Sequence, residues 1–82
     1  MTTNTTTVIK LDTISAALVD LQAIYANLPV AELQRRRSGL MRSAMAVYEA
    51  TSLELDADYR IADRASFDRA YELVMEIDRV GF

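Results

Sequence analysis

The chain has 82 residues and a net charge of −3, and 51% of its residues are hydrophobic. This length allows one domain at most, and the hydrophobic content argues against intrinsic disorder. The sequence contains no Cys and no His, which excludes disulfides and zinc sites built from those residues. No apolar run reaches the roughly 18 residues of a membrane span, and the N-terminus lacks a signal-peptide pattern. We therefore expect a cytoplasmic protein, in its own cell or in a host cell.

Charge is distributed unevenly along the chain. Residues 1–50 carry five basic and four acidic side chains, whereas residues 51–82 carry four basic and eight acidic ones. An acidic C-terminal half disfavours nucleic acid through phosphate repulsion and suits a protein partner with a basic surface. The alternative is a solvated surface that serves solubility alone.

The N-terminal residues 1–11 are rich in Thr and are expected to form a flexible or short extended tail, followed by one helical domain over 12–82. The first helix is predicted over residues 12–28, with Asp12 or Thr13 as its N-cap and Pro29 directly after its end. Its apolar residues recur at helical spacing: Ile14, Ala17, Leu18, Leu21, Ile24, Tyr25 and Leu28. The opposite face is small and mildly apolar and can take a second contact through Ala16, Val19, Ala23 and Ala26.

A second helix is predicted over residues 30–52, because Pro29 is favoured in a first turn and Glu32 suits the positive helix end. Two residues fit this helix badly. Arg37 lies within its apolar stripe, and Gly39 weakens a helix interior by about 1 kcal/mol relative to Ala. Either Arg37 pairs with a carboxylate of the acidic C-terminal half, or the helix breaks near Ser38.

Residues 53–61 alternate apolar and polar, which indicates an extended connector that could include a short strand. The last helix is predicted over residues 63–80, starting near Asp63–Ser66. Its apolar stripe covers nearly half its circumference, so it needs more than one neighbour. The predicted fold class is all-α, a small three-helix bundle.

The residue types needed for catalysis are scarce. A nucleophile beside a His base is impossible without His, and no Gly-rich phosphate loop can form with only two glycines. The pair Asp56 and Asp58 does not continue into a calcium loop, because Arg60 and Ile61 stand where Asp or Asn and then Gly are required. Four Tyr and four Met residues fall mostly on apolar stripes. We expect no enzyme activity, no metal and no cofactor.

Two charged surfaces remain as candidate partner-binding sites. On the last helix, the carboxylates share one face at i, i+4 spacing, with arginines beside them: Asp68, Glu72, Glu76, Arg69 and Arg79. The second candidate is the basic group Arg35, Arg36 and Arg42. If the chain turns near Ser38, these arginines gather at a helix N-terminus as an anion site. If the helix is continuous, they lie on its solvent side.

The sequence SGLMRSAMAVY (residues 38–48) resembles the second helix of ribbon-helix-helix repressors and antitoxins, and TVIKL (residues 7–11) resembles their N-terminal strand. The resemblance implies a dimer in which two such strands pair and enter the DNA major groove. It implies that Val8 and Lys10 read DNA and that phosphate is bound near Arg37 and Ser38. An acidic C-terminal arm would then bind a toxin.

The main functional hypothesis is a non-enzymatic regulator or inhibitor that occupies a functional surface of a partner protein. Compact acidic helical proteins of this size are common among phage-encoded or mobile-element-encoded inhibitors of bacterial defence, such as anti-CRISPR proteins, which is an analogy of class only. The alternative is the dimeric antitoxin or repressor just described, and a third hypothesis is a structural subunit of an assembly. A homodimer is compatible with each hypothesis.

Overall fold

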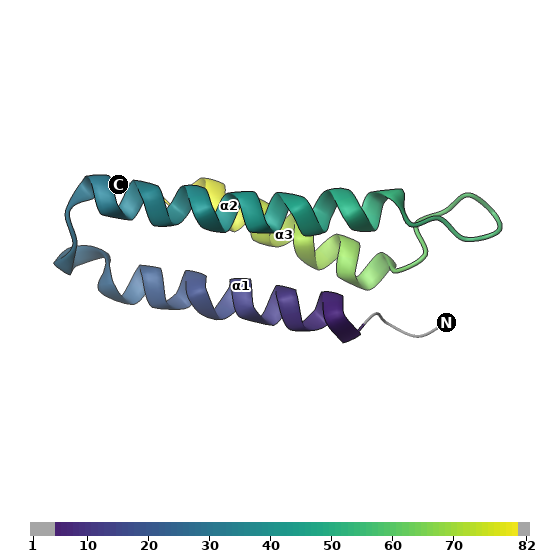
Figure 1. Cartoon of the computed structure of the whole chain (residues 1–82), viewed down its shortest axis with the longest axis horizontal. Coiled ribbons are helices and arrows are strands. Elements are labelled where there is room, and N and C mark those ends of the chain that lie inside the picture. Colours follow the sequence, from purple (N-terminus) through teal and green to yellow (C-terminus); the bar gives the residue numbers. More distant parts are fainter. Residues whose placement is uncertain (1–4, 81–82) are drawn as a thin grey trace.

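A computed structural model describes residues 5–80 and contains three α-helices, α1 (Thr5–Ile24), α2 (Val30–Leu53) and α3 (Arg64–Arg79). A short 3₁₀ helix, η1 (Tyr25–Asn27), connects α1 to α2. The helices run up, down and up: α1 and α2 lie side by side in opposite directions, and α3 runs behind them (Figure 1). The bundle is elongated, with extents of 48 × 18 × 14 Å. The predicted all-α class with three helices is confirmed.

The core forms where all three helices meet. Its buried residues are Leu11, Ile14, Leu18, Ala44, Val47, Ala70, Leu73 and Ile77. Ala44 and Ala70 are fully buried, and such small side chains allow helices to approach closely. Next to them, the rings of Tyr48 and Phe67 stack with centroids 5.0 Å apart. This layer explains why the apolar stripe of α3 is wide: α3 contacts both α1 and α2.

The expected flexible or extended segment over residues 5–11 is wrong, because α1 already begins at Thr5. Leu11 has no exposed surface, so tertiary packing favours helix there despite the poor helix propensity of the threonines. Asp12 and Thr13 are therefore interior residues of α1, and Thr13 Oγ1 donates to the Ile9 carbonyl at 2.9 Å instead of capping. Residues 1–4 of the expected tail lie outside the described residues.

Helix α2 is continuous through Ser38 and Gly39. Arg37 extends from it to the C-terminal end of α3, where Nε donates to the Ile77 carbonyl at 3.0 Å and Nη2 donates to the Asp78 carbonyl at 3.0 Å. Nη2 also lies 3.7 Å from the Asp78 carboxylate. Of the two alternatives for Arg37, pairing with the acidic half is confirmed and the helix break is wrong. The guanidinium group lies within an apolar stripe because it donates hydrogen bonds to backbone carbonyls at the C-terminal end of α3.

The connector before α3 forms a hairpin loop rather than a regular strand, with a single antiparallel bridge between Leu55 and Ile61. Asp63 then caps α3: its Oδ1 accepts a hydrogen bond from the Ser66 amide at 3.2 Å. This confirms the predicted start of the last helix, since a carboxylate before the first turn satisfies an otherwise unpaired N–H.

Candidate protein-binding surfaces

The acidic row on α3 is exposed, and its members differ in their partners. Asp68 accepts a hydrogen bond from Arg64 Nε at 2.9 Å, so part of its charge is neutralised within the helix. Glu72 and Glu76 are exposed and make no hydrogen bond or ion pair with any residue between 5 and 80. Arg79 is exposed in the last turn, where a cation is favoured by the helix dipole. The free negative charge of this face therefore lies at Glu72 and Glu76.

Arg69 is paired with a residue of another helix. Its Nη2 lies 2.6 Å from Asp12 Oδ1, so it links α3 to α1. The guanidinium is 39% exposed, and an ion pair at such a surface contributes at most about 1 kcal/mol. Arg69 thus links α3 to α1, and its charge is partly neutralised by Asp12.

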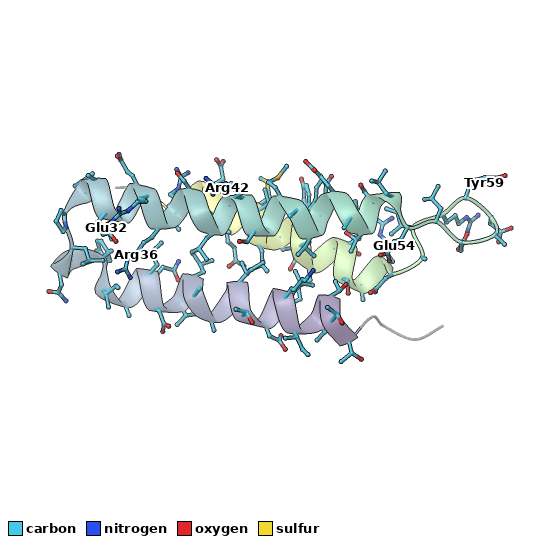
Figure 2. All side chains as sticks on the ribbon, in the orientation of Figure 1. Glu32, Arg36, Arg42, Glu54 and Tyr59 are labelled. Carbon is cyan, nitrogen blue, oxygen red and sulfur yellow. The ribbon has the colours of Figure 1, made fainter. Side chains whose placement is uncertain are left out.

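The basic group on α2 is largely paired. Glu32 accepts ion pairs from both Arg35 and Arg36, the latter with Arg36 Nε 3.1 Å from Glu32 Oε1. Figure 2 shows Glu32 and Arg36 near the η1 end of α2, with Arg42 further along the helix. Arg42 is exposed and forms no ion pair within the described part of the chain. Because α2 continues through this region, no helix N-terminus lies beside the arginines, and the anion site that depended on one is not formed.

A third surface, not predicted from the sequence, is the hairpin loop over residues 54–62, hereafter the 54–62 loop. Asp56 organises it: its Oδ1 accepts hydrogen bonds from the amides of Asp58 at 2.8 Å and Arg60 at 3.1 Å. Its own amide donates to the Arg60 carbonyl at 2.8 Å, and the Ala62 amide donates to the Glu54 carbonyl at 2.8 Å. These bonds close the loop on itself and hold its backbone in one shape.

Tyr59 occupies the position that makes this loop unusual. Its backbone is in the left-handed region (φ 60°), where a three-residue hairpin loop normally has Gly. A non-Gly residue there costs about 1–2 kcal/mol. Its ring is 85% exposed, so no packing within the chain compensates that cost. Figure 2 shows Tyr59 at the far tip of the molecule, beyond the ends of the helices.

More apolar surface gathers at the same end of the bundle. Leu53, the last residue of α2, is 80% exposed, and Leu55 is half exposed. Glu54 and Asp58 are exposed beside them and form no ion pair within residues 5–80. The end of the molecule thus presents one aromatic and two aliphatic side chains among charged residues of both signs, since Arg60 is exposed beside Tyr59. The sequence did carry one indication of this loop, because Asp two residues before another polar residue is typical of a side-chain-closed turn.

Among the described residues, no group of three or more His, Cys, Asp or Glu side chains could hold a metal ion. Within the same residues, none of the helices combines the length and the apolar character that crossing a membrane requires. The comparisons with protein-family models, with curated proteins and with solved structures found no match to this chain.

Proposed function

We propose that this protein is a non-enzymatic, protein-binding regulator that acts by occupying a functional surface of a partner protein. The observation that carries the proposal is Tyr59, an exposed aromatic ring held on a closed loop in a backbone conformation unfavourable for it. Strained residues persist where function requires them, and Tyr is among the residues that contribute most to binding at protein interfaces.

The rigidity of the 54–62 loop supports the same role. Because its hydrogen bonds already form within the chain, little conformational entropy is lost when a partner binds. The exposed Leu53 and Leu55 extend the apolar contact area around Tyr59. The matching partner surface is an apolar pocket that receives the Tyr59 ring, with Lys or Arg at its rim opposite Glu54 and Asp58 and a carboxylate opposite Arg60.

The acidic row on α3 is proposed as a second contact. Glu72 and Glu76 keep their full charge available, and charged groups at the rim of an interface speed association with an oppositely charged partner. A basic groove that normally holds nucleic acid is one surface this row could cover. An inhibitor of a bacterial defence protein, encoded by a phage or a mobile element, is the more specific form of the proposal, supported by class analogy in size, charge and helix content.

The ribbon-helix-helix form of the DNA-binding alternative has lost its structural basis. It depended on a strand at residues 7–11 and on a helix break near Ser38, whereas residues 7–11 belong to α1 and α2 runs through Ser38. We do not propose it.

The test is affinity capture from a cell lysate with four immobilised baits: the unmodified chain, Tyr59→Asn, Tyr25→Asn and the double variant Glu72→Lys/Glu76→Lys. Asn tolerates a left-handed backbone, so Tyr59→Asn removes the ring while it keeps the loop. Tyr25 is an exposed tyrosine in η1, at the opposite end of the bundle, and serves as the matched control (Figure 1).

We expect a protein that binds the unmodified chain and Tyr25→Asn but is lost with Tyr59→Asn. Calorimetry with that protein should show an affinity loss of about 30-fold or more, as for a central interface residue. The Glu72/Glu76 reversal should weaken binding less and mainly slow association. Capture that is equal for all four baits, or no capture at all, would contradict the proposal.

A further inference from the structure

A long groove follows the face of the α1–α2 pair that α3 does not cover. It consists of two adjoining hollows with volumes of about 450 Å³ and about 530 Å³, and Ser43 lines both. Figure 1 looks onto this face, with α3 behind the pair. Several of the side chains that line it are short: Thr13, Ala17, Gly39, Ser43, Ala46 and Ala50.

This face of the α1–α2 pair is open to close approach by other helices. A Cβ atom added at Gly39 would meet nothing within 4 Å, so the chain itself leaves this space unfilled. Helices lined by small side chains can pack at the short end of the usual 8–10 Å interaxial range.

Two opposite charges lie on the α1 side of the groove, one in each half. Lys10 lines the half near the start of α1, and Asp20 lines the half near Arg36. Both are exposed, and neither forms an ion pair with a residue in the range 5–80. Residue 15 lies midway between Lys10 and Asp20 along α1. Ser43 lines both halves, so it lies near the middle of the groove on α2. Lys10 and Asp20 are therefore placed symmetrically, with opposite signs, about the middle of the groove, whereas Arg36, the third charge that lines it, is paired with Glu32.

From this symmetry we infer that this face of the α1–α2 pair binds the same face of a second copy of this chain, in an antiparallel arrangement about a twofold axis at the level of Ser43. The axis reverses the helix direction, so α1 faces α1 of the second copy and α2 faces its α2. Lys10 of each copy then meets Asp20 of the other, which gives two ion pairs per dimer, as an isologous interface requires. Parallel stacking of the two copies would not bring these opposite charges together.

The available area is sufficient for such a dimer. At 1.5 Å per residue α1 is about 30 Å long, and two adjacent helices are about 20 Å wide, so the face offers about 600 Å² per copy. The total of about 1,200 Å² lies at the lower end of specific interfaces. The dimer is accordingly expected to dissociate on dilution.

The test measures self-association by sedimentation over a concentration series. The unmodified chain should dimerise. Ala46→Arg, which places a long charged side chain in the groove, should be monomeric, whereas Ala23→Arg, at an exposed position of α1 that does not line the groove, should dimerise normally. Circular dichroism checks that each variant keeps its helix content.

Charge exchange tests the antiparallel register directly. Lys10→Glu alone and Asp20→Lys alone each replace two attractions by two repulsions, and each should raise the dimer Kd by about tenfold or more. The double variant should recover the original Kd. An equimolar mixture of the two single variants should form a heterodimer, because the carboxylate introduced at position 10 of one variant then meets the ammonium introduced at position 20 of the other.

A chain that stays monomeric at every concentration overturns the inference, as does a dimer that Ala46→Arg leaves intact. A dimer that neither the double variant nor the mixture restores overturns the antiparallel register and with it the proposal. Tyr59→Asn should not change self-association, so this result is independent of whether the 54–62 loop binds a partner.

Discussion

Replacement of Arg37 by Ala should destabilise the whole bundle, although Arg37 is a charged residue that is 32% exposed. The substitution removes two hydrogen bonds from a guanidinium to the carbonyls of Ile77 and Asp78 at the end of α3. A hydrogen bond to a charged group contributes about 1.5–3 kcal/mol, and partial exposure allows water to replace some of that. We therefore expect a loss of about 2–3 kcal/mol in the free energy of unfolding. A domain of this size has a total of only about 4–12 kcal/mol.

Urea unfolding followed by circular dichroism measures this loss, and thermal unfolding should show a fall of about 10–20 °C in Tm. Arg42→Ala is the matched control: Arg42 is an exposed arginine on the same helix without an ion pair among the described residues, so its change should stay within about 0.5 kcal/mol. Arg37→Lys keeps the charge but not the forked donors, and its stability should lie between the two. Equal losses for Arg37→Ala and Arg42→Ala would refute the view that Arg37 holds the end of α3.

The two remaining predictions concern the segment between α2 and α3. Asp63→Ala removes the N-cap of α3 and should lower the free energy of unfolding by about 1 kcal/mol; native-state hydrogen exchange should locate the change in the first turn, and a slow Ser66 amide would contradict it. Tyr59→Gly relieves the left-handed backbone and loses little packing, so stability in urea should stay unchanged or rise by up to about 1 kcal/mol. A clear loss would mean that the ring contributes to the fold.

Helices α2 and α3 were predictable from the sequence because local chemistry marks their ends. Pro29 stands directly before α2, and Asp63 caps α3, so the predicted bounds of 30–52 and 63–80 fall within one residue of the observed ones. The N-terminal turns of α1 carry no such mark. Threonines there favour extended backbone, and the burial of Leu11 in the core shared with α2 and α3 favours the helix instead.

The candidate surfaces were predicted less completely, for a related reason. Spacing on a helix correctly placed Glu72 and Glu76 on one exposed face, but it could not show that Arg69 pairs with Asp12 on another helix. The alternation over residues 53–61 indicated extended backbone, and the chain does extend through Leu55 and Ile61. Between them the chain reverses direction, because the Asp56 side chain accepts hydrogen bonds from the amides of Asp58 and Arg60. An alternation of apolar and polar residues does not reveal such hydrogen bonds.

Because the 54–62 loop is closed by its own hydrogen bonds, substitutions in the helices and substitutions in the loop have separate effects. Substitutions on the exposed faces of the helices can accumulate without altering the shape of the tip, because none of the bonds that define the tip reaches the helical body. Conversely, residues 57 and 58 can vary freely as long as Asp56 and a residue that accepts left-handed backbone remain at their places. Under the proposed function, substitutions of a few side chains at this end would change the binding surface with little effect on whether the protein folds.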